Sequence, residues 1–120
     1  MSILELQARD RAAARLAADV ASYALGVPVE EILEARQGGP RATAFARHVA
    51  VYLCHTGFEM SLARVAIAFG RDRSTIAHAC HVIEDRREEP QFDLWIGGLE
   101  TMLQQTPTSQ WRPPSEAKAS

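Results

Sequence analysis

The sequence predicts an all-α protein: one compact helical domain of about six helices that contains a helix-turn-helix unit. Three observations favour this fold class. Leu, Ala, Glu and Arg dominate the chain, apolar residues recur at helical spacing, and no segment shows the alternation that is typical of a strand. Gly and Pro fall between the periodic segments, where they end helices or make turns. The length of 120 residues, 47% of them apolar, suits a single domain with a buried core.

The first three helices are bounded by Gly and Pro. An Ala-rich helix ends at Gly26, because glycine tolerates the left-handed conformation that often follows a last turn. A short helix starts after Pro28 with two glutamates in its first turn, where the helix dipole favours acid. A third helix carries apolar residues at helical spacing and is closed by Gly57. These helices are expected near residues 4–25, 29–35 and 42–55.

The last three helices follow the same logic. Ser61 is a preferred N-cap residue for the fourth helix, and Gly70 makes the turn that follows it. The fifth helix begins near 72–74 and runs to shortly before Pro90. The fourth and sixth helices are expected at residues 62–69 and around 92–103.

We expect three parts along the chain. An N-terminal helical extension covers residues 1–14, the helix-turn-helix domain covers 15–104, and a Pro/Ser-rich tail, 105–120, has the composition of a disordered segment. The two cysteines, Cys54 and Cys80, form no CxxC pattern and read as buried helical residues. No stretch resembles a membrane span or a secretory signal, so we expect a cytoplasmic, nucleoid-associated protein.

The charge is unevenly distributed. The formal net charge of −2 by itself argues against a nucleic-acid partner. Residues 36–87, however, hold eight arginines against four acidic residues, whereas both ends of the chain are acidic. Such a layout is typical of a protein with one basic face. Lys118 is the sole lysine among thirteen basic residues; this bias fits either GC-rich codon usage or selection of guanidinium groups for phosphate and guanine.

The segment 62–81 has the pattern of a helix-turn-helix. Two steeply crossed helices need a small residue where they nearly touch and a turn residue that tolerates positive φ, and Ala66 and Gly70 have that spacing. The apolar residues expected to face inward are Val65, Phe69, Ile76 and Ala79. The polar residues that gather at the start of the second helix are Arg71, Asp72, Arg73, Ser74, Thr75 and His78. The start of that helix is the end that enters a major groove, although units of this shape also serve as protein–protein modules.

At these residues the chain resembles a known family. Ser61-Leu62 and Ala-Phe-Gly-Arg-Asp-Arg-Ser-Thr-Ile-Ala-His-Ala-Cys (68–80) are similar to the signature of the C-terminal DNA-binding domain of the bacterial chromosomal replication initiator, DnaA. That signature reads close to S-L-P-E-I-G-x-x-F-G-G-R-D-H-[ST]-T-V-x-H-A. The likeness covers about residues 15–103 and includes the segment 46–53.

The resemblance implies a set of DNA contacts. The residues that it assigns to double-stranded DNA are Arg36, Arg41, Arg47, Ser61, Leu62, Arg71, Asp72, Arg73, Ser74, Thr75 and His78. It places the residues that start the recognition helix at bases, Arg47 and His78 at phosphates, and the loop with Arg36 and Arg41 in the minor groove. By its chemistry, Asp72 can either accept from a cytosine amino group or simply cap the helix.

The chain departs from the family signature at several positions. Arg73 replaces the family's histidine, and an arginine at a base-facing position prefers guanine O6 and N7, so the preferred box is expected to differ. One glycine of the family's pair is missing before Arg71, and Ala63 stands where the family has proline. The loop 37–40 reads Gln-Gly-Gly-Pro instead of a basic run.

Several kinds of activity have no support in the sequence. A Gly-rich nucleotide-binding loop with its lysine is absent, so the chain looks like a stand-alone version of the DNA-binding module without ATPase activity, nucleotide or cofactor. The histidines and cysteines lack zinc spacing, so no metal is expected. No catalytic constellation stands out, and we expect a non-enzyme.

Two functions therefore compete. The first is sequence-specific binding of initiator-type boxes in duplex DNA, which would regulate chromosomal replication initiation or transcription. The second is a protein-interaction module that modulates the replication initiator or its inactivating machinery without needing DNA. Leu4, Leu6 and Trp111 are the candidate contacts of that second function.

Overall fold

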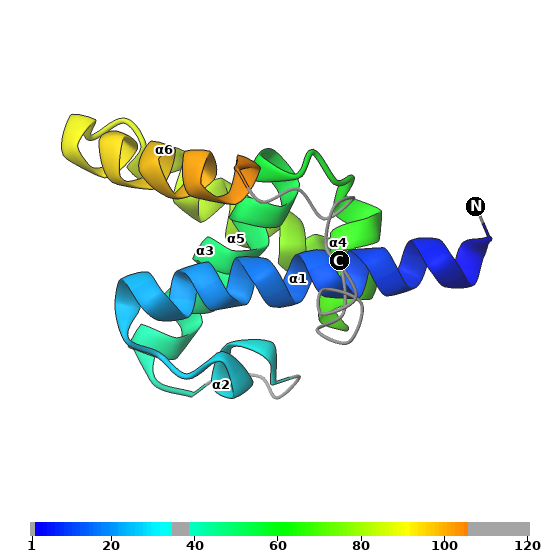
Figure 1. Cartoon of the computed structure of the whole chain (residues 1–120). Helices are drawn as coiled ribbons and strands as arrows, with labels where there is room; N and C mark the ends of the chain where they lie inside the picture. Colours follow the sequence, from blue (N-terminus) through cyan, green and yellow to red (C-terminus); the bar gives the residue numbers. More distant parts are fainter. Residues whose placement is uncertain (1, 35–38, 106–120) are drawn as a thin grey trace, which may run out of the picture.

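The structure confirms an all-helical fold (Figure 1). It is a computed structural model that describes residues 2–34 and 39–105. Within these ranges the chain forms six helices and no strand. None of these helices has both the length and the apolar character that crossing a membrane requires. The helices are α1 (Ile3–Leu25), α2 (Val29–Leu33), α3 (Arg41–Gly57), α4 (Leu62–Phe69), α5 (Arg73–Arg86) and α6 (Pro90–Gln104).

Helix α3 is the centre of the fold. The other five helices all pack against it, and α1, the longest rod in the view, passes across it (Figure 1). The stretch Val49–Cys54 of α3 is buried at every position. Burial on all sides requires apolar residues around the whole helix, which explains why this stretch is the most apolar of the chain.

The predicted helix ends are largely confirmed. Gly26 and Gly70 both adopt the left-handed conformation, with φ of 72° and 66°, and the Ser61 hydroxyl accepts a hydrogen bond from the Arg64 backbone N–H at 3.2 Å. α3 continues to Gly57, two residues beyond its predicted end at 55: Gly57 keeps helical geometry, and the positive φ falls on Glu59. Gly57 is instead needed for packing, because a Cβ there would lie 3.1 Å from Leu103 Cδ2.

Two further helices, α2 and α6, also differ in length from the prediction. α2 stops at Leu33, because Glu34 has an extended backbone conformation instead of continuing the helix to residue 35. α6 starts two residues early, at Pro90, since proline suits the first helical position, where its missing N–H has no helical partner.

The predicted domain boundaries remain predictions. α1 runs without a break across the expected boundary at 14/15 and already buries Asp10 and Ala13. The tail beyond residue 105 lies outside the described residues.

The helix-turn-helix is formed by α4, Gly70 and α5. The four predicted inward residues, Val65, Phe69, Ile76 and Ala79, are all buried, and so is Ala66, where the two helices approach. The turn is closed by backbone bonds from the Gly70 N–H to the Ile67 carbonyl and from the Arg71 N–H to the Ala66 carbonyl. The turn therefore holds α4 and α5 at a fixed angle.

Long-range ion pairs tie this unit to the rest of the domain. Arg64 on α4 donates to both carboxylate oxygens of Asp10 on α1, at 3.0 and 2.6 Å. Arg87, just after α5, pairs with Asp93 and Glu100 on α6 and donates to the Tyr52 hydroxyl on α3. Burial, together with the bond to Glu84, keeps the pKa of Tyr52 raised, at about 12, so the hydroxyl stays neutral.

Gly70→Ala tests the strain at the turn. An L-residue in the left-handed region is disfavoured, so we expect a loss of about 1 kcal/mol in the free energy of unfolding, measured by urea denaturation. Gly98→Ala is the matched control: Gly98 is helical and a Cβ would meet open space, so alanine should stabilise by about 0.5 to 1 kcal/mol. Equal effects of the two substitutions would contradict the turn assignment.

Arg64→Ala tests the link between α1 and α4. It leaves the Asp10 carboxylate, whose side chain is only 10% exposed, without its bidentate partner. We expect the free energy of unfolding to fall by about 2 kcal/mol, also by urea denaturation. Arg11→Ala, at an exposed position of α1, should change it by less than about 0.5 kcal/mol. A change of that small size for Arg64→Ala would show that the pair contributes little.

Candidate nucleic-acid interface

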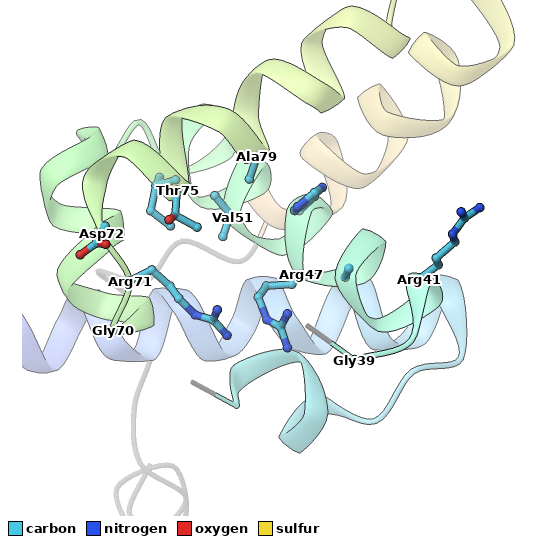
Figure 2. A pocket seen from close by; sticks show the side chains of 12 residues that line it. Gly39, Arg41, Arg47, Val51, Gly70, Arg71, Asp72, Thr75 and Ala79 are labelled. Carbon is cyan, nitrogen blue, oxygen red and sulfur yellow. The ribbon is translucent and has the colours of Figure 1, made fainter. Parts of the chain in front are cut away.

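A groove of about 540 Å³ lies between the first half of α3 and the start of α5 (Figure 2). It is bounded at one end by the Gly70 turn and at the other by the first turn of α3. Its lining residues are Gly39, Arg41, Ala44, Arg47, His48, Val51, Gly70, Arg71, Asp72, Thr75, Ile76 and Ala79. The groove thus adjoins the segment for which the sequence predicts DNA contact.

The groove carries positive charge. Arg41, Arg47 and Arg71 line it, against the single carboxylate of Asp72. Figure 2 shows Arg47 and Arg71 directed toward the same space beside α2, while Arg41 points outward at the far end. Concave surfaces with one sign of charge concentrate the field, so this groove is suited to an anionic partner.

The start of α5 presents exposed polar side chains. Asp72 has the backbone conformation of an N-cap residue, but its side chain makes no capping hydrogen bond, although the sequence left capping open as its role. Arg73, Ser74 and Thr75 follow it and are all exposed. The Asp72 carboxylate therefore points to solvent next to the positive end of the helix dipole, where it is available to an external hydrogen-bond donor.

Arg47 is bound to the end of α2. Its Nε donates to the Ile32 carbonyl at 2.9 Å and its Nη2 donates to the Glu31 carbonyl at 2.9 Å. These carbonyls have no partner within so short a helix, so the guanidinium acts as a C-terminal cap from another helix. Burial and the nearby charge of Arg71 lower the pKa of Arg47, although it remains charged. The phosphate contact predicted for Arg47 would have to use its remaining N–H groups.

Arg71 is held at the same place. It is half-buried, and its Nη2 donates to the Glu34 carbonyl, directly after α2. Together, Arg47 and Arg71 fix the end of α2 against the groove. The two arginines thus build one wall of the groove as well as giving it charge.

Two histidines meet across the wall between α3 and α5. The rings of His48 and His78 lie edge to face, with centroids 6.2 Å apart. Burial, then the charges of His78 and Arg47, lower the pKa of His48 below its usual 6.5. The groove thus favours the neutral form of the His48 imidazole.

The predicted DNA contacts fall into three groups. Arg41, Arg47, Arg71, Asp72 and Thr75 line the groove together. Arg73, Ser74 and His78 are exposed on α5 beside it. Of the remaining three, Ser61 and Leu62 do not line the groove, and the third is Arg36.

Those three residues have separate positions. Ser61 caps α4, and Leu62 is half-buried against the core. Arg36 lies outside the described residues.

Sequence reasoning missed the part of α3 that lines the groove. The residues concerned are Ala44, His48 and Val51, which continue a stripe from Arg41 at intervals of three, four and three residues. That spacing places them on one helix face, so the stripe could have been found from the sequence. What the spacing could not show is that the stripe faces α5.

The described part of the chain offers no metal-binding cluster beside the groove. Among the described residues, no group of three or more His, Cys, Asp or Glu side chains could hold a metal ion. Both cysteines are free and buried, and burial raises their pKa values, that of Cys80 to about 11.

Sequence comparisons match this chain to one kind of domain in known proteins. The sequence model of a family described as "Bacterial dnaA protein helix-turn-helix" matches residues 15–83. The chromosomal replication initiator protein DnaA of Aquifex aeolicus is 36% identical over 83 residues, which make up 68% of this chain and 20% of that protein. The DnaA of Bifidobacterium animalis subsp. lactis is 42% identical over 55 residues, 45% of this chain and 9% of that protein. The chain therefore spans a fifth or less of these relatives.

Solved structures agree with the sequence matches. The crystal structure of a DNA replication initiation factor superposes with a TM-score of 0.73 and 27% identity, covering 86% of this chain and 32% of that one. A replication initiator DnaA bound to AMPPCP and single-stranded DNA superposes with a TM-score of 0.72 and 27% identity, covering 87% and 31%.

Arg47→Lys and Arg47→Ala test the capping of α2. A lysine keeps the charge but cannot reproduce the two-pronged bond, so both variants should lower the free energy of unfolding by about 1 to 2 kcal/mol, measured by urea denaturation. Arg41→Ala, an exposed arginine of the same groove, should stay within about 0.5 kcal/mol of the original protein. A lysine variant as stable as the original protein would show that only the charge matters.

Proposed function

Since the chain belongs to the family of bacterial DnaA helix-turn-helix domains, we propose that it binds double-stranded DNA through α5 and the adjoining groove, and acts in chromosomal replication initiation. The observation that carries this proposal is the start of α5. There the uncapped Asp72 and the exposed Arg73, Ser74 and Thr75 stand beside a groove lined by three arginines.

The geometry of α5 supports a major-groove role. α5 packs against α3 and α4 and buries Ile76, Ala79, Cys80 and Ile83, whereas the polar residues of its first turn are exposed on the domain surface. The major groove of B-DNA is wide enough to admit a helix in this orientation. An interface built in this way would read bases with the first turn of α5.

The side chains suit distinct bases. Arg73 can bond guanine O6 and N7 with two N–H groups, and the Asp72 carboxylate can accept from a cytosine amino group. Thr75 offers either a hydroxyl to a phosphate or a methyl to thymine. The interface is thus suited to a box containing guanine and cytosine, which supports sequence-specific binding.

The groove supports contact with the DNA backbone. Arg41 and Arg71, the free N–H groups of Arg47, and His78 lie on the side where phosphates would pass a helix seated in the major groove. About five phosphate contacts correspond to a slope of log K against log salt of about −4 to −5. These contacts would set the affinity and orientation, while α5 would set the sequence preference.

We propose that this binding requires no nucleotide chemistry. The sequence has no Gly-rich loop with the lysine that reaches nucleotide phosphates, because Lys118 is its sole lysine. Occupation of initiator-type boxes would then regulate replication initiation, or transcription, by competition for those sites.

A protein-interaction module is the second candidate function. Exposed apolar side chains favour it, since Ile3 and Leu4 on α1 and Ile67 on α4 are each about two-thirds exposed or more. Of the predicted partner contacts, Leu4 is exposed, Leu6 is half-buried and Trp111 lies outside the described residues. A pull-down of replication proteins with Leu4→Ser separates the two functions, because it leaves α5 intact.

Arg73→Ala tests duplex recognition. Removing the two-pronged guanine contact should weaken binding to the preferred duplex by about 1 to 3 kcal/mol and relax the preference at one base pair, measured by fluorescence anisotropy with a library-selected duplex. Arg11→Ala, an exposed arginine on α1, should leave the affinity unchanged. Salt-independent affinity, or full binding by Arg73→Ala, would reject the interface.

A further inference from the structure

His78 is among the proposed phosphate contacts, but that role does not explain why its ring lies against the ring of His48. His48 belongs to α3 and lines the groove, and His78 belongs to α5, one turn after Thr75. Their rings meet edge to face at 6.2 Å between centroids. The pair therefore joins the central helix to the helix proposed to enter DNA, on the groove side.

Four arginines and three carboxylates of the described residues lie on the elements around His48. The charged and titratable groups around it come from four elements. Arg41 and Arg47 on α3, Arg71 in the turn and Asp72 before α5 line the groove with His48, and His78 on α5 meets its ring. Arg86 on α5 lies over the ring of Phe45, one turn before His48. The end of α2 contributes Glu31 and Glu34. The two carboxylates at the end of α2 face this part of α3: Glu31 accepts a hydrogen bond from Thr43, and the charge of Glu34 acts on Arg47.

This environment disfavours protonation of His48 in the free protein. Half-burial disfavours a charged imidazole at His48, and the neighbouring Arg47 and His78 oppose a further positive charge. A phosphate group in the groove would reverse the balance, because an anion within a few ångströms of an imidazole stabilises its protonated form. Because the two rings lie only 6.2 Å apart, a positive charge on one ring repels a second positive charge on the other.

We propose that His48 is an additional duplex-contacting residue that acts with His78 as one proton-binding site, so that DNA binding takes up a proton and tightens as the pH falls. The inference rests on the proposed function, since the phosphate that drives proton uptake is that of the bound duplex. A proton moves from solvent to one imidazole nitrogen, and the resulting imidazolium donates to a phosphate oxygen. His48 was not among the contacts implied by the family resemblance.

The test is the pH dependence of duplex affinity at constant ionic strength. The original protein should bind about three- to ten-fold more tightly at pH 6 than at pH 8, with uptake of up to one proton per duplex. Calorimetry in buffers of different ionisation enthalpy measures that uptake directly. His48→Gln should remove most of the pH dependence, and His48→Gln combined with His78→Gln should remove the rest.

His81→Gln is the matched control. His81 lies on the same helix, is exposed, and pairs with Asp85 at 3.3 Å instead of lining the groove, so its loss should leave the pH profile unchanged. His78 is also exposed, so His78→Gln gives a readout even if His48→Gln unfolds the domain, and circular dichroism checks the fold of each variant.

The outcomes separate this inference from the proposed function. Duplex binding at pH 8 with a pH profile that His48→Gln and His78→Gln leave unchanged would overturn the proton-binding site and leave duplex binding standing. Failure of the original protein to bind duplex DNA at either pH would overturn both.

Discussion

The burial of α3 on all sides is the constraint on which the rest of the structure depends. Five helices pack against it, and each position of Val49–Cys54 is removed from solvent. A helix enclosed in this way can present side chains only toward its two ends, where the enclosure stops, and one of these ends is its first two turns. The groove opens there, so the packing that stabilises the domain also decides where Arg41, Arg47 and His48 meet α5.

Among the arginines of residues 36–87, Arg64 and Arg87 stabilise the fold through ion pairs, whereas Arg41 and Arg73 are exposed to solvent. Arg64 is paired with Asp10, and Arg87 with Asp93 and Glu100. The acidic partners come from the acidic ends of the sequence, so part of the negative charge is neutralised inside the domain. This pairing explains how a chain of net charge −2 presents a groove with three arginines and one carboxylate.

The elements of the fold could be predicted because their causes are local. The period of apolar residues placed all six helices, and Gly26, Ser61 and Gly70 act at the predicted helix ends. The end of α2 could not be predicted in this way. It stops at Leu33 where arginines from residues 47 and 71 take up its last carbonyls, and no pattern within the helix indicates a cap supplied from so far along the chain.

The sequence by itself determined the all-helical class, the helix-turn-helix and the polar start of α5, because helix periodicity, caps and turns depend on neighbours within a few residues. Only the tertiary structure decided that Arg64 pairs with the Asp10 carboxylate, that the Asp72 side chain does not cap α5, and that the His48 ring contacts the His78 ring. These features join residues up to 54 positions apart, and the spacing along a chain does not specify which faces of two helices touch.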